Sequence, residues 1–134
     1  MSTTREYIHP EISPEARPFW DAANKGKLVI HTCRDCGRGH HYPRAMCPHC
    51  YSADLEWKET DGHGEIYSFS VVTAGKDLPR YVIAYVEIAD RVKAMTNIVD
   101  CDPDSLRIGQ RVKAVFRPSK TGQNILLFSP LESL

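Results

Sequence analysis

Four of the five cysteines occur in two short pairs, and these pairs carry the clearest chemistry in the sequence. Cys33 and Cys36 form one C-x-x-C motif, and Cys47 and Cys50 form a second one after ten intervening residues. Two residues between cysteines allow a tight turn that directs both sulfur atoms at one ion, and two facing turns complete a tetrahedron with Zn–S distances of about 2.3 Å. The spacing therefore predicts one zinc ion per chain, bound by Cys33, Cys36, Cys47 and Cys50.

Four cysteine ligands also define the role of the metal. Because thiolates fill every position of the tetrahedron, water and substrate find no open coordination site, and the zinc is expected to be structural. The same ligand set suits a rubredoxin-type iron site, so the sequence leaves zinc and iron as alternatives. Apparent binding free energies of such zinc sites are about 10–16 kcal/mol, which is comparable to the whole stability of a small domain. We expect the metal-binding segment to unfold without its ion.

Other reactive side chains near the motifs have simpler expected roles. His49 lies inside the second motif and is expected to face solvent, because four thiolates already complete the site. His40 and His41, in the loop between the motifs, are also expected to be exposed. Gly37 follows the first motif, where the chain often needs a positive φ. Cys101 lies between two aspartates that raise its thiol pKa, so it is expected to be structural.

A helical segment is expected before the first cysteine pair. Ser13 is a candidate capping residue, and Gly26 supplies a stop. Pro18 lacks an N–H for an intrahelical bond, so the regular helix is expected to begin near it, with residues 13–17 as a looser turn. One apolar face is formed by residues at helical spacing: Ala16, Phe19, Trp20 and Ala23.

From His63 onward the sequence alternates apolar and polar residues in five runs separated by turns, which predicts five strands. A helical turn ended by glycine is expected at residues 102–109, after the third run. Five strands with a helix after the third is the order of the oligonucleotide/oligosaccharide-binding barrel, the OB-fold. The first strand is expected to place Tyr67, Phe69 and Val71 on one face, and the second strand Val82, Ala84, Val86 and Ile88. The third strand is suggested by Val92, Ala94, Thr96 and Ile98, the fourth by the inward residues Val112, Ala114 and Phe116, and the fifth by the run from Ile125 to Phe128.

The predicted fold is mainly β, with an N-terminal helical segment (1–26), a zinc ribbon (27–59) and a five-stranded OB-fold barrel (60–134). With 134 residues, the chain has no room for a large enzyme core. The common catalytic signatures, such as G-x-S-x-G, H-E-x-x-H and G-x-G-x-x-G, are absent from the sequence. No signal peptide or membrane span is recognisable, so a cytoplasmic protein without membrane contact is expected.

Five segments in and around the cysteine pairs occur together in this chain: Phe19-Trp20, Leu28-Val29-Ile30, Cys33 to Gly37, Tyr42-Pro43-Arg44 and Cys47 to Cys50. With these segments the chain resembles a known family, the zinc-ribbon/OB-fold acyl-CoA-associated proteins. Family members have an N-terminal helical segment, a rubredoxin-like ribbon and a C-terminal OB-fold, and the resemblance covers nearly the whole chain. One departure is Tyr42, at a position where Phe commonly precedes the Pro-Arg pair.

This resemblance implies a non-catalytic accessory subunit of an acyl-CoA-processing enzyme. The expected partner is a thiolase-like enzyme, or else a hydratase or aldolase, with a coenzyme A thioester at the joint surface. Candidate contacts with the partner or the thioester are Phe19, Trp20, Tyr42 and Arg44. The Arg44 guanidinium matches phosphate or an acidic partner residue, although a loop salt bridge is an equal alternative. Phe19 and Trp20 could equally pack against their own barrel.

Two further functions remain as alternatives. One is single-stranded nucleic-acid binding, favoured by a local cluster of Arg111, Lys113, Arg117 and Lys120. However, Lys plus Arg and Asp plus Glu both number 17, and Phe116 is expected in the core, so the chain lacks a basic, aromatic groove and no nucleic-acid partner is expected. The other alternative is a rubredoxin-like electron carrier, which would hold iron and be red.

Overall fold

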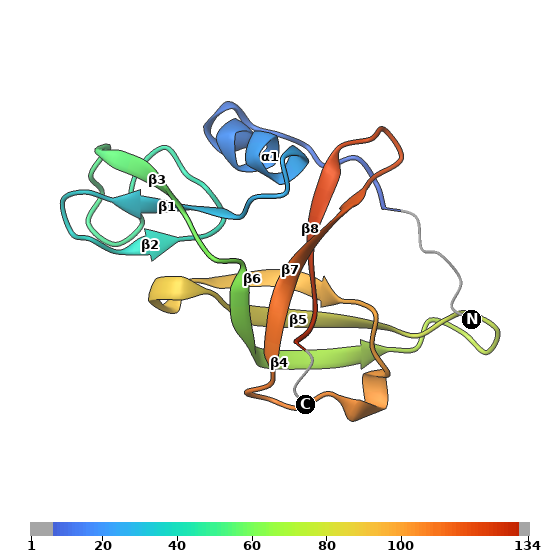
Figure 1. Ribbon diagram of the computed structural model, residues 1–134. Helices are drawn as coiled ribbons and strands as arrows, with labels where there is room; N and C mark the ends of the chain where they lie inside the picture. The colour runs from blue at the N-terminus through green and yellow to red at the C-terminus, as the bar shows by residue number, and fades with distance from the viewer. Residues whose placement is uncertain (1–6, 132–134) are drawn as a thin grey trace.

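The structure is a computed structural model that describes residues 7–131, in which a small sheet and a β-barrel lie side by side (Figure 1). A short helix, α1 (Arg17–Asn24), contacts both parts: it packs against strand β8 (Asn124–Pro130) of the barrel and strand β1 (Val29–Cys33) of the small sheet. The predicted order of helical segment, ribbon and barrel is confirmed.

The N-terminal helix is short and begins next to Pro18, as predicted. A 3₁₀ turn, Pro14–Ala16, leads into α1, Arg17–Asn24. The predicted apolar face is buried, but Ser13 makes no side-chain capping bond. The side-chain oxygen Oδ1 of Asn24 accepts a hydrogen bond from the backbone N–H of Asn124 at 2.9 Å, which links the helix to the start of β8. In the described part of the chain, no helix is long and apolar enough to cross a membrane.

The cysteine motifs are carried by a small antiparallel sheet with strand order β2-β1-β3. Its strands are β1, Val29–Cys33; β2, Gly39–His40; and β3, Leu55–Glu59. Strand β1 therefore runs directly into the first motif, and the second motif lies in the long loop that leads to β3.

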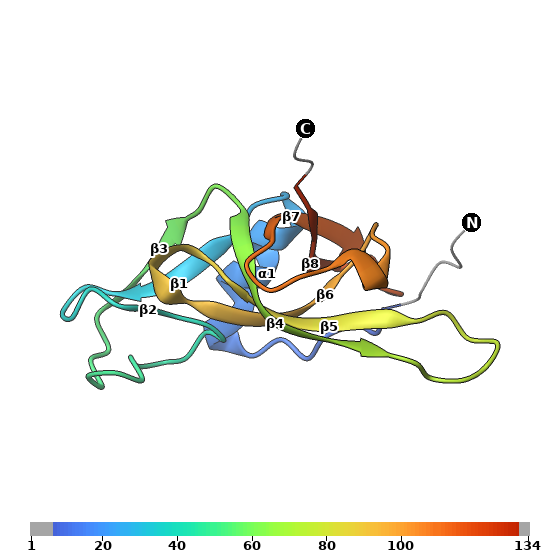
Figure 2. The same cartoon turned by 90° about the horizontal axis from the view of Figure 1, so that it is seen from below.

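The barrel has the strand order β4-β5-β6-β8-β7, with β7 pairing back to β4 (Figure 2). Strands β6 and β8 are parallel, and every other pair is antiparallel. Short 3₁₀ turns, η2 (Ala89–Arg91) and η3 (Pro103–Ser105), precede and follow β6, so the predicted turn after the third strand is present. The barrel strands are β4, His63–Val72; β5, Tyr81–Glu87; β6, Lys93–Ile98; β7, Arg111–Pro118; and β8, Asn124–Pro130.

The apolar residues predicted for the second to fifth strands are buried or pack against the core, but the first strand differs. Ile66 is 1% exposed and Tyr67 is 53% exposed, whereas Tyr67 was expected to share a face with Phe69 and Val71. The cause is a β-bulge between Ile66 and Ser68, which shifts the alternation by one residue. Phe69 and Val71 pack against the core as expected.

The small sheet shares the core of the barrel. Leu28 and Ile30 belong to the same buried cluster as the inward residues of the barrel strands. At the contact between the two parts, a Cβ added to Gly39 would lie 2.9 Å from Val92 Cγ2, so a glycine is needed for β2 to approach this closely. The cysteine motifs are thereby held at a fixed place beside the turn between β5 and β6.

Candidate metal centre

The two cysteine motifs form matching turns. The N–H of Gly37 donates to the carbonyl of Cys33 at 2.9 Å, and the N–H of Tyr51 donates to the carbonyl of Cys47 at 2.9 Å. Both residues that follow a motif have positive φ, +78° for Gly37 and +65° for Tyr51. The expectation for Gly37 is confirmed, and Tyr51 takes the same conformation without being glycine.

The four sulfur atoms form a cluster that fits one tetrahedral metal ion. All four Sγ atoms lie within 4.8 Å of one another. Cys33 Sγ lies 3.6 Å from Cys50 Sγ, and Cys36 Sγ lies 3.7 Å from Cys47 Sγ. Zn–S bonds of about 2.3 Å place ligands about 3.8 Å apart in a regular tetrahedron, so these spacings agree with a zinc–thiolate centre. Cys33 and Cys47 are buried, whereas Cys36 and Cys50 lie at the surface.

Hydrogen bonds prepare the sulfur atoms for binding a cation. The N–H of Cys36 points at Cys33 Sγ at 3.5 Å, and the N–H of His49 points at Cys47 Sγ at 3.3 Å. Burial opposes ionisation of Cys47, but donors from the backbone of its own turn and neighbouring thiols lower its pKa to about 7. The N–H of Ser52 also favours a thiolate at Cys50, yet the surrounding sulfur atoms raise the pKa of that thiol to about 12. A bound metal therefore has to displace protons from the cluster.

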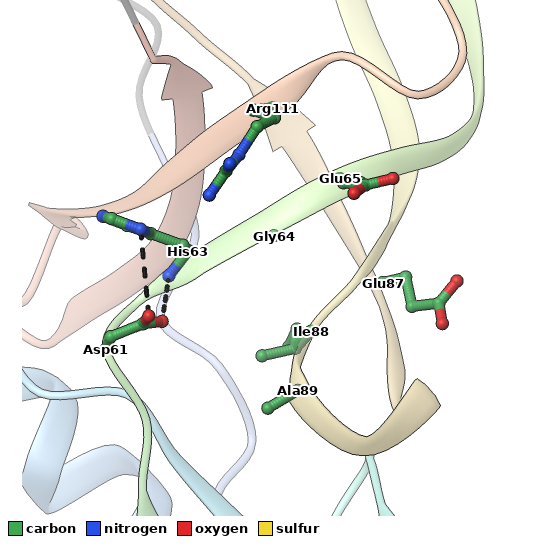
Figure 3. A pocket seen from close by; sticks show the side chains of 8 residues that line it. All are labelled: Asp61, His63, Gly64, Glu65, Glu87, Ile88, Ala89 and Arg111. Carbon is green, nitrogen blue, oxygen red and sulfur yellow. Dashed lines mark hydrogen bonds and ion pairs between the residues drawn. The ribbon is translucent and has the colours of Figure 1, made fainter.

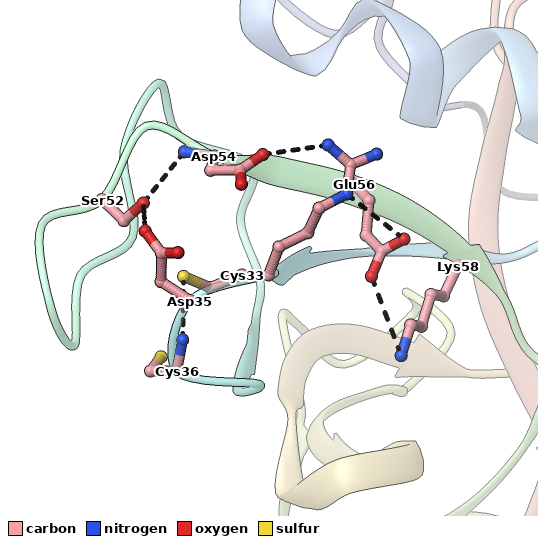
Figure 4. Close-up of polar contacts among 8 residues, drawn as sticks. Cys33, Asp35, Cys36, Ser52, Asp54, Glu56 and Lys58 are labelled. Carbon is pink, nitrogen blue, oxygen red and sulfur yellow. Dashed lines mark hydrogen bonds and ion pairs between the residues drawn. The ribbon is translucent and has the colours of Figure 1, made fainter.

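Polar side chains join the first motif to β3 (Figure 4). Arg34 Nη1 donates to Asp54 Oδ1 at 2.9 Å, and Arg34 Nε lies 3.7 Å from Glu56 Oε1. On the other side of the turn, Ser52 Oγ donates to Asp35 and accepts from the N–H of Asp54 at 3.0 Å. These pairs are exposed and screened by solvent, so they add little to stability. They orient the turn that carries the first cysteine pair.

The histidines of the ribbon do not all behave as expected. His49 is exposed, as predicted, but His40 is only 6% exposed and that prediction was wrong. The reason is strand pairing: His40 lies across from His31, whose ring stacks on Trp57 with centroids 4.1 Å apart. Burial, with smaller effects of nearby cations, lowers the pKa of His40 to about 4. His41 is half-buried, and burial lowers its pKa to about 4 as well.

The four candidate contact residues divide into an inner and an outer pair. Phe19 and Trp20 are 3% and 8% exposed and pack edge to face, with ring centroids 5.2 Å apart. Trp20 Nε1 donates to the hydroxyl of Tyr42 at 2.6 Å, so the helix holds the loop between the cysteine motifs. Tyr42 is 39% exposed and Arg44 is exposed. Their role in contacting a partner or thioester stays a prediction, for which Tyr42 and Arg44 offer surface.

A hollow of about 330 Å³ lies where β4, β5 and β7 meet near the ribbon (Figure 3). The His63 imidazole lies 3.8 Å from Asp61, while Glu65 pairs across the sheet with Glu87 on one side and Arg111 on the other. Three carboxylates, one imidazole and one guanidinium line it, so the hollow suits polar contacts rather than an acyl chain.

The barrel also exposes aromatic residues that the sequence pattern assigned differently or did not single out. Tyr67 and Tyr85 are 53% and 46% exposed, and Met95 lies directly across from Tyr85. Lys93 Nζ lies 4.7 Å from the centroid of the Tyr67 ring. In contrast, Arg117 of the basic cluster forms an ion pair with Asp100. The outward position of Tyr67 depends on the β-bulge, which leaves no clear mark in the sequence.

Cys101 behaves as a structural thiol. Its side chain packs against the barrel core. Burial raises its thiol pKa first, and the charges of Asp102 and Asp100 raise it further. A raised pKa keeps the thiol protonated and makes it a poor nucleophile.

Two family models match consecutive parts of the chain. Residues 20–56 match the rubredoxin-like zinc ribbon domain of ChsH2, and residues 57–117 match the C-terminal OB-fold domain of ChsH2. The solved structure described as "Ltp2-ChsH2(DUF35) aldolase" superposes with a TM-score of 0.81 and 30% identity, covering 91% of this chain and 98% of that chain.

Curated relatives give the same picture. A DUF35 domain-containing scaffold protein of Methanothermobacter thermautotrophicus is 40% identical over 63% of this chain and 68% of its own length. A probable enoyl-CoA hydratase alpha subunit of Thermomonospora curvata is 35% identical over 77% of this chain. The match spans 33% of that hydratase subunit, so most of the hydratase chain has no counterpart in the aligned region.

Proposed function

Because this chain belongs to the DUF35 family of zinc-ribbon and OB-fold proteins, we propose that it is a non-catalytic accessory subunit of an acyl-CoA-processing enzyme. The observation that carries this proposal is the similarity to the Ltp2–ChsH2 aldolase structure, which extends over both the ribbon and the barrel. The name of the hydratase relative supports both parts of this proposal: it names an enzyme of acyl-CoA chemistry, and an alpha subunit works with at least one other subunit.

A partner enzyme would supply the groups that act on the thioester. Cleavage or formation of a carbon–carbon bond next to a thioester needs a nucleophile or base and donors that stabilise an oxyanion. The cysteines of this chain are unsuited to that task, because four form the metal cluster and Cys101 has a raised pKa. We propose a thiolase-like enzyme as partner, with a hydratase or an aldolase as the alternatives that the relatives' names favour.

The metal in this proposal is one structural zinc ion per chain. The match to a zinc ribbon model and the near-tetrahedral sulfur spacing both support zinc. Cys33, Cys36, Cys47 and Cys50 would hold it, and it would stabilise the ribbon without acting on substrate. The ribbon would in turn hold the loop that carries Tyr42 and Arg44.

The surface proposed to face the partner and the coenzyme A thioester is the loop between the cysteine motifs. Arg44 is exposed there and makes no ion pair with any residue that the structure describes, so its guanidinium is available for a phosphate or a carboxylate. Tyr42 lies beside it and is held by Trp20. Phe19 and Trp20 would act mainly by supporting this loop from inside.

Affinity purification from the native host, followed by mass spectrometry, tests the proposal. We expect a thiolase, hydratase or aldolase homologue to dominate the captured proteins. Arg44→Glu should reduce its recovery at least tenfold, because reversing a charge at an interface costs several kcal/mol. Arg107→Glu, an exposed arginine on the η3 side of the barrel, is the matched control and should not change recovery. Recovery of ribosomes or polymerase in place of an acyl-CoA enzyme would refute the proposal.

A further inference from the structure

A second hollow, of about 370 Å³, lies between the cysteine turns and the barrel. Its wall is formed by the turn between β1 and β2, by the second cysteine motif and by η2, which lies below β2 in Figure 1. The described lining residues are Gly37, Arg38, Gly39, His49 and Arg91. Three of these five residues have side chains with N–H donors, namely two guanidinium groups and one imidazole, and none of the five is acidic.

The two arginines of this hollow have unused side chains. Arg34, Arg80 and Arg117 each form ion pairs with aspartate side chains. In contrast, Arg38 and Arg91 make no side-chain ion pair or hydrogen bond with any residue in the described part of the chain. Two guanidinium groups at one hollow repel each other, so a bound anion lowers their energy.

The backbone holds Arg91 at this place in a strained conformation. Arg91 has a φ of +64°, a region that costs a residue with a side chain about 1–2 kcal/mol and that glycine enters freely. A Cβ added to Gly39 would lie 2.9 Å from Cγ2 of Val92, the residue after Arg91, so the ribbon turn and the η2 turn lie close together at this point. An arginine in a conformation that favours glycine, at the edge of a basic hollow, indicates a use for its side chain.

We propose that this hollow binds a phosphate group, held by the guanidinium groups of Arg38 and Arg91 and by an imidazole N–H of His49. Guanidinium forks match phosphate oxygens in pairs, and an imidazole can donate an N–H whether or not it is charged. The ligand class is therefore a phosphate monoester or diphosphate. Its source rests on the proposed function: within an acyl-CoA complex, it is the phosphorylated nucleotide end of the coenzyme A thioester.

Titration of the zinc-loaded full chain with inorganic pyrophosphate, followed by amide NMR, tests the site. We expect shifts at residues 37–39, 49 and 91, and about tenfold weaker binding for Arg38→Gln and for Arg91→Gly. Arg91→Gly removes the strained φ together with the charge, so a folding defect would not explain the loss. Arg107→Gln is the matched control and should bind as the unchanged chain does. Equal affinity in all variants, or shifts elsewhere, would overturn the site.

Two further arms separate the source of the phosphate and the role of the arginines. Coenzyme A should compete with pyrophosphate for the same amides, whereas pantetheine, which has no phosphate, should not. Pyrophosphate binding without competition by coenzyme A would overturn that source. If Arg38→Gln lost zinc while its pyrophosphate affinity stayed unchanged, the arginine would serve the thiolate cluster and the phosphate site would be refuted. Copurification of a partner judges the accessory-subunit proposal separately, because none of these titrations includes a partner.

Discussion

The ribbon and the barrel are both β-structures, but they are stabilised in different ways. In the barrel, inward residues from all five strands form one buried cluster, so its stability comes from apolar contacts. The ribbon contributes Leu28 and Ile30 to that cluster, whereas its outer half carries the four clustered cysteines, which we propose hold it together through a bound metal ion. A strand pattern therefore specifies the barrel, whereas a ligand pattern specifies the ribbon. The two parts should respond differently to the same kind of perturbation.

The largest difference is expected when the metal ligands are changed. Cys47→Ser removes a buried ligand, and the loss of about 10–16 kcal/mol of linked metal binding should unfold residues 33–54. Elemental analysis should show about one zinc per unchanged chain and none in the variant, and amide NMR should show lost dispersion in the ribbon. Cys101→Ser is the control and should keep the zinc. A metal-free chain with an ordered ribbon, or a chain that carries iron, would contradict the structural-zinc proposal.

A core substitution in the barrel should lower the stability of the fold but leave zinc binding intact. Phe128 is fully buried in β8, so Phe128→Ala should lower the free energy of unfolding by about 3–5 kcal/mol. Urea denaturation measures this change, and Ile108→Ala, at a residue that is 69% exposed, should stay within about 0.5 kcal/mol. At low denaturant the variant should still bind zinc. Loss of zinc from folded Phe128→Ala would show that the metal site depends directly on the barrel core.

The contact between the two parts can be tested at Gly39. An added Cβ would lie 2.9 Å from Val92 Cγ2 and 3.2 Å from Ile30 Cγ2, so Gly39→Ala should cost about 1–3 kcal/mol. A double variant, Gly39→Ala with Val92→Ala, should recover part of this loss relative to the sum of the single changes. Strict additivity of the two changes in urea denaturation would mean that this contact does not couple ribbon and barrel.

The smallest effects should come from the residues after each cysteine motif. Gly37 has a φ of +78° and an added Cβ would meet nothing within 4 Å, so Gly37→Ala tests backbone strain alone. We expect a loss of about 1 kcal/mol in the stability of the zinc-loaded chain. Tyr51→Gly should change stability by less than about 1 kcal/mol, because relief of strain at φ +65° is offset by a more flexible unfolded chain. A larger loss for Tyr51→Gly than for Gly37→Ala would show that the Tyr51 side chain has contacts of its own to lose.

The sequence predicted those features that depend on local chemistry. The spacing of the cysteines identified the cluster, and the runs of apolar residues identified core residues in the second to fifth barrel strands. The sequence did not predict features that depend on pairing between strands. The exposure of Tyr67 follows from a bulge, and the burial of His40 follows from its place across from His31. Similarly, Arg38 and Arg91 are 53 positions apart in the sequence and share a hollow only because the ribbon docks on the barrel.

The hydrogen bonds between α1 and the start of β8 have a consequence for how the chain folds as it is synthesised. The Asn24 side chain accepts from the N–H of Asn124, and Gln123 Nε2 donates to the carbonyl of Trp20, so these contacts join residues about one hundred positions apart. While a ribosome is still adding residues 25–122, the helix has no β8 on which to dock, and Phe19 and Trp20 are without their final cover. The four cysteines lie within 18 residues, so the proposed metal ion can bind them before then. Contacts of such long sequence separation form slowly, so docking of the first helix is expected to be a late step in folding.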